Sequence, residues 1–252
     1  MRRQTFVSRL DDRLRTDDYA DVDASANGLQ VGRAEGTVER VALAVDAADT
    51  TITDAVERGA DCLLVHHGLA WGGFDRLTGL HYDRIEPLVE HDVALYVSHL
   101  PLDGHQELGN AAGLADVLGL EDREPFGEYG PEYVGTRGTA ADAYDVDGVA
   151  TLLDEELDIE TQVLDFGPNE IEDVGIVTGS GVDWIEAATE AGLDAVVTGE
   201  GKQQAYHEAR DRGLNVFLAG HYATETFGVR ALGRLAEEWG VGTTYIDHPT
   251  GI

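Results

Sequence analysis

The chain has 252 residues, 42% of them hydrophobic, and its 49 acidic and 17 basic residues give a formal net charge of −32 at pH 7. This length allows a full hydrophobic core, in one large domain or two small ones, and the apolar content argues against disorder. The acidic balance argues against binding nucleic acid through a basic surface. Because molar salt shortens the Debye length to ~3 Å and screens self-repulsion, we expect a halophilic protein.

The composition also bears on where the protein works. No run of about 18 apolar residues is present, so we expect no membrane span. The segment Met1 to Phe6 has two arginines without an apolar stretch behind them, so we expect no secretory signal. Cys62 is the only cysteine, which excludes intrachain disulfides, zinc fingers and iron–sulfur centres. A cytoplasmic protein fits this cysteine usage.

The predicted elements of the first half alternate between strand and helix. We expect a helix at 6–15, a turn into a short strand at 27–32, strands at 41–46, 62–65 and 94–97, and helices at 50–58, 84–90 and 106–118. A glycine-rich loop at 69–79 separates the strand at 62–65 from the next helix. Residues 121–139 are predicted to be turn-rich, with a weaker element at 149–157.

The second half repeats the alternation. We expect strands at 174–178, 195–198 and 216–219, helices at 183–191, 203–212 and 224–238, and a last short strand at 245–246. This order predicts the α/β class with mainly parallel sheets, in which sites form beyond the carboxyl ends of strands. We divide the chain into a first α/β half at 1–120, a turn-rich connection with peripheral elements at 121–160 and a second α/β half at 161–252.

An internal duplication relates the two halves. Val38–Gly68 and Ile171–Gly201 align without a gap over 31 residues. Beyond them the offset falls from 133 to 122, as if 69–79 were extra in the first copy, and His99 then aligns with His221. Any two strand–helix–strand units look somewhat alike, but a long ungapped match weakens that alternative. Two halves packed about a pseudo-twofold axis would bring their strand ends to one metal site between them.

Histidines and carboxylates gather at these predicted strand ends. His66 and His67 follow the strand at 62–65, and His221 follows the strand at 216–219 with Glu225 four residues on. Imidazole and carboxylate ligands suit a divalent metal, and there are enough here for two ions. The alternatives are one buried and one exposed histidine at the first strand end, and a helix-capping contact between His221 and Glu225 at the second.

Further candidates follow the strand at 94–97 and the one at 195–198. Pro101 prevents a regular helix from running through the segment from His99 to Asp103, so these two residues need not share a face. Asp103 is the stronger ligand candidate, whereas His99 is a ligand, a partner that orients one, or an acid/base group. Glu200 aligns with His67 and is a water-activating base, a group that orients a ligand, or a solvated carboxylate. His105 either orients a ligand or lies at the surface.

Five motifs together resemble one family: Asn27-Gly28-Leu29-Gln30-Val31, His66-His67-Gly68, His99-Leu100-Pro101-Leu102-Asp103, Thr198-Gly199-Glu200 and Gly220-His221-Tyr222-Ala223-Thr224-Glu225. The resemblance, nearly end to end, is to the NIF-three-like dinuclear metal-binding family, often labelled GTP cyclohydrolase I type 2 homologues, in the short form without an inserted middle domain. It implies five metal ligands, with Glu225 bridging both ions: His66, His67, Asp103, His221 and Glu225. It also implies a cytoplasmic homohexamer, a trimer of dimers with sites facing an inner cavity.

Two functions follow from this set. The first is a two-metal hydrolase of a small molecule, in which Glu200 or His99 moves protons. The family label implies opening of the guanine ring of GTP, but few basic residues lie near the motifs, so a neutral amide or ester, or a phosphoester held by the metals, is as plausible. The second is a non-enzymatic regulatory protein or metal carrier. His/carboxylate ligands suit Zn, Mn, Fe, Co or Ni.

Overall fold

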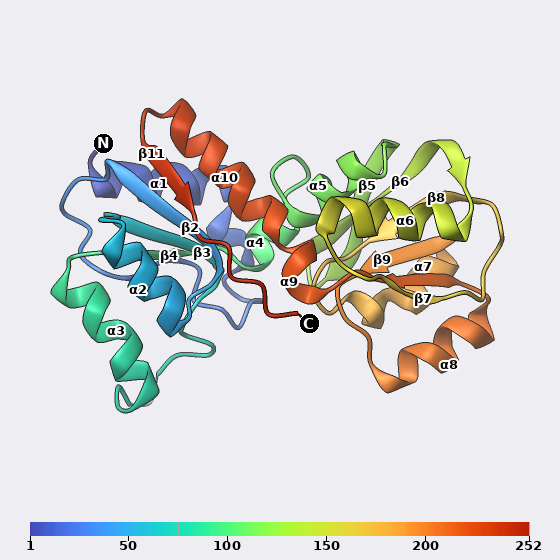
Figure 1. Ribbon diagram of the computed structural model, residues 1–252, viewed down its shortest axis with the longest axis horizontal. Coiled ribbons are helices and arrows are strands. Elements are labelled where there is room, and N and C mark those ends of the chain that lie inside the picture. The colour runs from blue at the N-terminus through green and yellow to red at the C-terminus, as the bar shows by residue number, and fades with distance from the viewer. Residues whose placement is uncertain (75, 252) are drawn as a thin grey trace. The chain divides into compact units, whose positions relative to one another are not determined.

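The computed structural model describes residues 1–74 and 76–251 and shows a mixed α/β protein with two sheets (Figure 1). The predicted α/β class is therefore confirmed. The chain forms two compact units, one of residues 1–102 with 228–248 and one of residues 103–227 with 249–252. The division at 1–120, 121–160 and 161–252 stays a prediction.

The sheet of the first unit has the strand order β1-β4-β3-β2-β11. Its strands are β1 (Gly28–Val31), β2 (Arg40–Asp46), β3 (Cys62–His67), β4 (Ala94–Val97) and β11 (Gly242–Tyr245). All neighbours pair in parallel except β1, which is antiparallel to β4. The strand expected near Tyr245 thus joins the first sheet, beside β2.

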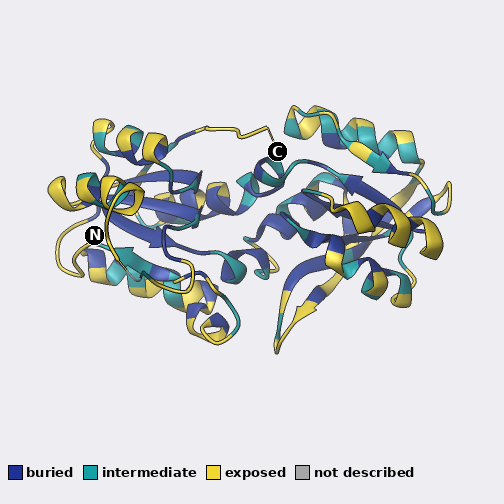
Figure 2. Cartoon of the chain, turned by 90° about the horizontal axis from the view of Figure 1, so that it is seen from below, coloured by how far each residue is buried: buried dark blue, intermediate teal, exposed yellow. Residues whose placement is uncertain are grey.

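Helices cover both faces of this sheet, which explains why β2, β3 and β4 are continuous apolar runs. The helices are α1 (Arg3–Leu14), α2 (Asp49–Glu57), α3 (Leu80–Glu90) and α10 (Thr226–Glu238), with a 3-10 turn at Thr16–Tyr19. Ile52 of α2 and Leu88 of α3 pack with Leu63 and Val65 in one buried cluster. The central strands are dark blue, the colour of buried residues, in Figure 2.

The sheet of the second unit has the order β5-β6-β8-β9-β10-β7. Its strands are β5 (Leu120–Tyr129), β6 (Glu132–Tyr144), β7 (Gln162–Leu164), β8 (Ile171–Ile176), β9 (Ala195–Thr198) and β10 (Asn215–Leu218). The parallel core β8-β9-β10 is flanked by antiparallel pairs. The helical elements are α5 (Asn110–Val117), α6 (Val146–Leu157), η2 (Gly181–Trp184), α7 (Ile185–Glu190), α8 (Gln203–Arg212) and α9 (His221–Thr224).

The segment predicted to be turn-rich forms the antiparallel hairpin β5–β6 instead. β5 is mostly exposed, and the buried positions of β6 include Gly135, Thr136 and Gly138, so neither strand shows the apolar alternation that marks a strand in a sequence. Pro125 fits because β5 is an edge strand, where a missing backbone N–H is tolerated. Gly130, at φ +64, lies in the two-residue turn between the strands.

Strand register supports the duplication. Val41 pairs with Cys62 in the first sheet, and Val174 pairs with Ala195 in the second, so both partners keep the offset of 133. In the next strand, however, Val97 faces Val65 whereas Leu218 faces Thr198, which makes the offset 121 rather than 122. His221 therefore lies one position beyond the structural equivalent of His99.

Helix length and hydropathy decide whether a helix could span a bilayer. The amphipathic helix α10 has only 13 residues. Within residues 1–74 and 76–251, no helix is long and apolar enough to cross a membrane.

Candidate metal centre

Three histidines of the first unit form a cluster at the carboxyl ends of β3 and β4. His66 and His67 are the last two residues of β3, and His99 follows β4 (strands in Figure 1). One ring nitrogen from each lies within 4.8 Å of the others, so the three could hold a metal ion. Their ring centroids are 4.6 Å apart for His66–His67, 5.1 Å for His66–His99 and 5.6 Å for His67–His99.

The Nδ1 atom of each ring contacts an oxygen acceptor. His66 Nδ1 lies 2.8 Å from the Ser98 carbonyl oxygen, and His67 Nδ1 lies 2.9 Å from Asp46 Oδ1. His99 Nδ1 lies 2.9 Å from Asp23 Oδ1. Because these oxygens accept hydrogen bonds, each Nδ1 carries a proton, which leaves Nε2 as the ring nitrogen that can bind a metal. That tautomer, fixed by an oxygen partner, is the usual state of a metal-binding histidine.

Asp23, the partner of His99, accepts several other hydrogen bonds. Its side chain is 1% exposed and accepts hydrogen bonds from the backbone N–H groups of Ser25 and Leu100 and from the Asn27 amide. Burial alone would raise the pKa of Asp23, but hydrogen bonds from His99, Asn27 and Ser25 and the charge of His99 outweigh it, so the pKa lies below its ordinary value. An ionised carboxylate is thus held against His99.

Asp23 and Asp46 were not predicted from the sequence as site residues. Asp46 could have been predicted, because it ends a buried strand and lies opposite His67 once β2 and β3 are paired in parallel. Asp23 lies in an irregular segment with no periodic pattern. The motif Asn27 to Val31 has a role here, because Asn27 Oδ1 accepts the backbone N–H of His99 at 2.8 Å and Gln30 Oε1 accepts the backbone N–H of Leu69 at 2.6 Å.

Four predicted site residues belong to the second unit. The ring of His221 lies between two carboxylates, with Nε2 3.2 Å from Glu225 Oε1 and Nδ1 3.4 Å from Glu200 Oε1. The hydrogen bond to Glu225 is the main cause that raises the pKa of His221 to about 9; burial opposes it, and the charges of both carboxylates add to it. Glu225 is buried, whereas the side chain of Glu200 is 44% exposed.

Asp103, the fourth, ends the one-turn helix α4 (Leu100–Asp103). Pro101 is compatible with this short helix because it lies in the first turn, where the backbone N–H needs no partner. The buried carboxylate accepts hydrogen bonds at Oδ1 from the Asn110 amide at 2.9 Å and the Thr178 hydroxyl at 3.2 Å. These two donors fix the orientation of the carboxylate plane.

A glycine turn between β8 and η2 packs against Glu225. Gly179 has φ +61, and a Cβ added to it would collide with Glu225 Oε1 and lie 3.1 Å from His221 Nε2. The Gly179 N–H donates to the Thr224 hydroxyl at 3.3 Å, and the Gly181 N–H donates to the Thr198 hydroxyl at 2.8 Å. The sequence Gly179-Ser180-Gly181 therefore serves close packing around a carboxylate rather than forming a nucleophile elbow.

The remaining candidate, His105, has a local role. Its Nδ1 accepts the backbone N–H groups of Glu107 at 3.2 Å and Leu108 at 3.1 Å. It therefore supports the turn before α5. Taken together, the imidazoles of the first unit and the imidazole and carboxylates of the second are donor types that fit a borderline divalent cation.

Comparison with known proteins gives consistent results over the full length of the chain. A family model described as Duf34/NIF3 (NGG1p interacting factor 3) matches residues 1–250. A Halobacterium salinarum protein named "GTP cyclohydrolase 1 type 2 homolog" is 58% identical, covering 98% of both chains. A Pyrococcus abyssi protein of the same name is 44% identical, covering 100% of both. The crystal structure of TTHA1606 from Thermus thermophilus has a TM-score of 0.91 at 40% identity, covering 100% of both chains.

Proposed function

Because the chain belongs to the Duf34/NIF3 family, we propose that it is a metal-dependent hydrolase of a small molecule. The observation that carries this proposal is the three-histidine cluster, in which His66, His67 and His99 each have Nδ1 at an oxygen acceptor. This arrangement makes each Nε2 the nitrogen that acts, as a metal ligand in His66 and His67 and as a proton carrier in His99. Metal ligands are commonly held in their binding geometry by hydrogen bonds of this kind.

The proposed centre has two divalent cations and five ligands, namely His66, His67, Asp103, His221 and Glu225. This assignment is supported by the donor chemistry of each unit and by the resemblance of the five motifs to the family. Divalent ions in such a set supply Lewis-acid polarisation of a substrate oxygen and acidify water.

His99 and Glu200 are proposed to move protons. Asp23 holds the Nδ1–H of His99, so Nε2 can accept a proton and return it while Asp23 stabilises the resulting imidazolium. Glu200 is exposed and lies beside His221, where its carboxylate can accept a proton from water and also orient the ring. In this hydrolysis, one set of residues would hold the cations and another set would carry protons.

Metal analysis tests the proposal. Protein purified in molar KCl is expected to hold two ions per chain and to hydrolyse at least one substrate from a panel of GTP, phosphodiesters, esters and amides. Glu225→Gln is expected to retain one ion or none. Glu208→Gln, which removes an equal charge from an exposed position of α8, serves as the matched control and should keep both ions.

Two further variants separate ligands from proton carriers. His66→Gln should lose metal, whereas His99→Gln should keep it and lose turnover. Weakly held metal that passes to a chelator or an apo-protein acceptor, with no turnover of any substrate, would instead support the metal-carrier function. No metal in the wild type would contradict both.

The assembly is proposed from the resemblance as a homohexamer, a trimer of dimers. Exposed aromatic side chains at the tip of the β5–β6 hairpin, Tyr129 and Tyr133, are suited to a contact between copies. Sedimentation equilibrium in molar KCl should give six chains per particle. A monomer under these conditions would refute the hexamer without affecting the metal centre.

A further inference from the structure

One loop breaks the symmetry of the internal duplication. In the first unit β3 ends at His67 and α3 begins at Leu80, whereas in the second unit β9 ends at Thr198 and α8 begins at Gln203. The second copy shows that the scaffold closes without the longer connection. Leu69 and Ala70 are buried in the first unit, whereas Trp71 to Gly73 and 76–79 are exposed, and long loops of this kind commonly carry binding groups.

Trp71 connects this loop to the three-histidine cluster. Its ring centroid lies 4.9 Å from that of His99 in an edge-to-face arrangement and 6.0 Å from that of His67. Trp71 Nε1 donates to the Gly68 carbonyl at 3.2 Å, and its backbone forms a β-bridge with Ser25. The residue is nevertheless 46% exposed. A large aromatic ring that is held in place yet exposed beside three imidazoles offers a face to a flat ligand group.

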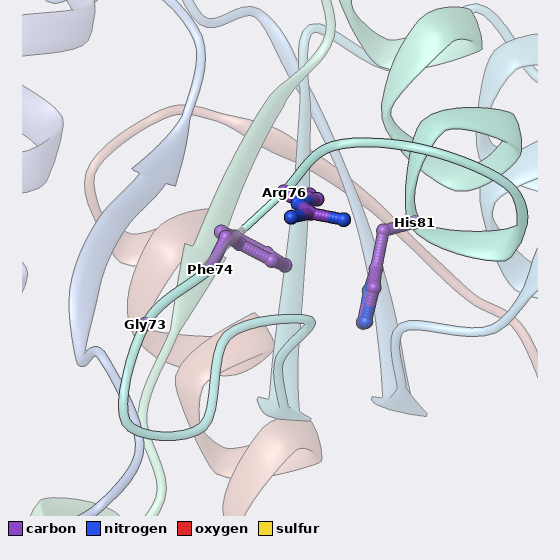
Figure 3. Close-up of a pocket in the computed structure, with 4 residues that line it drawn as sticks. All are labelled: Gly73, Phe74, Arg76 and His81. Carbon is purple, nitrogen blue, oxygen red and sulfur yellow. The ribbon is translucent and has the colours of Figure 1, made fainter.

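The same loop lines a cavity of about 670 Å³ with Gly73, Phe74, Arg76 and His81 (Figure 3). The side chains of Phe74, Arg76 and His81 point toward a common space in Figure 3. Phe74 and His81 are in edge-to-face contact, with centroids 5.1 Å apart. Arg76 follows Trp71 by five residues, a chain reach of at most about 18 Å, so one loop serves both the cavity and the cluster.

The charge of Arg76 indicates what the cavity binds. The chain has 49 acidic and only 17 basic residues, and many arginines pair with carboxylates, as Arg58 does with Asp54 and Arg212 with Glu186. Among residues 1–74 and 76–251, no hydrogen bond or ion pair joins Arg76 to a carboxylate. A guanidinium matches the geometry of carboxylate and phosphate groups through two parallel hydrogen bonds.

We propose that this cavity binds an oxyanion, a phosphate or carboxylate, carried on a flat ring. Arg76 and His81 hold the oxyanion, and Phe74, which is in edge-to-face contact with His81, contacts the ring. The inference rests on the proposed function and deepens it, because it selects a ring-bearing oxyanion over a neutral amide or ester as the substrate class.

Binding to chelator-treated protein tests the inference without the metals. Equilibrium dialysis would use phenyl phosphate and benzoate as ring-bearing oxyanions, and inorganic phosphate and phenol as their parts, at the lowest KCl concentration that keeps the protein folded. One of the two ring-bearing oxyanions should bind with one site per chain and more tightly than either part. Preference between them distinguishes phosphate from carboxylate recognition.

Variants assign the binding to the loop. Arg76→Gln should weaken binding of the preferred probe about tenfold or more, the usual loss for a charge-assisted pair. Arg210→Gln, the same charge change at an exposed position of α8, should leave it unchanged. Phe74→Ala should weaken binding of the ring-bearing probes and leave binding of inorganic phosphate unaffected, which also shows that the variant is folded.

Other outcomes overturn the inference. Equal weakening by Arg76→Gln and Arg210→Gln would mean general electrostatic attraction, and absence of oxyanion binding without metal would mean that the metals hold the anion. Failure of the proposed function would look different. Metal-free protein would still bind the ring-bearing oxyanion through Arg76, while metal analysis and the substrate panel would be negative.

Discussion

Replacing Gly179 by alanine tests whether the second unit holds Glu225 in a preset position. At φ +61 the left-handed backbone conformation costs an alanine about 1 kcal/mol of folding free energy. Its Cβ would also collide with Glu225 Oε1 and lie 3.4 Å from Glu225 Cδ. Overpacking of this kind costs about 1–3 kcal/mol. The free energy of unfolding should therefore fall by about 2–4 kcal/mol in total.

Gly192→Ala is the matched control. Gly192 has φ +75, and nothing lies within 4 Å of an added Cβ. It should lose only the backbone contribution of about 1 kcal/mol. The assay is urea unfolding of chelator-treated protein at constant molar KCl. The difference between the two variants isolates the steric conflict with the carboxylate, and Glu225→Ala combined with Gly179→Ala should remove that part.

Equal losses for the two glycine variants, or strict additivity in the double variant, would refute this reasoning. Either result would mean that the Glu225 carboxylate moves away from the new methyl group at little cost. The second unit would then hold Glu225 loosely, and its position would depend on the metal alone. Metal content of Gly179→Ala gives an independent reading, because a displaced carboxylate should lower it.

Three other predictions concern the first unit and the surface. Asp46→Ala should weaken metal binding by roughly tenfold to a hundredfold in a chelator competition, because His67 loses the partner that fixes its tautomer; unchanged affinity would contradict this. Burial raises the pKa of Asp11, so its stabilising contribution is present below the unfolded pKa and is lost as pH rises through the folded pKa. Asp11→Asn, which can still accept from the Tyr96 hydroxyl, should therefore raise the free energy of unfolding at pH 7 and give no gain near pH 4. The urea midpoint of the wild type should rise between 0.1 M and 2 M KCl as the Debye length shortens from about 10 Å to below about 3 Å, and equal midpoints would exclude a halophilic surface.

The sequence predicted the elements that are buried on both faces. Strands β2, β3 and β4 were located because each is an uninterrupted apolar run, and the histidines stood out because they end two of these runs. The β5–β6 hairpin was missed because β5 is mostly exposed and β6 places glycine and threonine at several of its buried positions, so neither strand forms an apolar run. Burial on both faces therefore decided which strands could be read from the sequence.

The groups that orient the histidines were harder to foresee. The contact between Asp23 and His99 joins residues 76 positions apart and follows no periodicity. Asp46 could have been found only by fixing the register of β2 against β3. The equivalence of His99 and His221 was displaced by one residue because the alignment matched the two histidines to each other, whereas the pairing of β4 with β3 and of β10 with β9 gives an offset of 121.

The proposed ligand set has a consequence for the charge of the substrate. The histidine ligands bind as neutral rings and contribute no charge, so among the proposed ligands only Asp103 and Glu225 offset the charge of the cations. Three further carboxylates, of Asp23, Asp46 and Glu200, contact the imidazoles of His99, His67 and His221. Counting them with the ligands, the formal charge of two divalent ions is fully compensated, so the centre does not by itself favour an anionic ligand over a neutral one. The choice of an oxyanion therefore depends on the guanidinium of Arg76 and not on the charge of the metals.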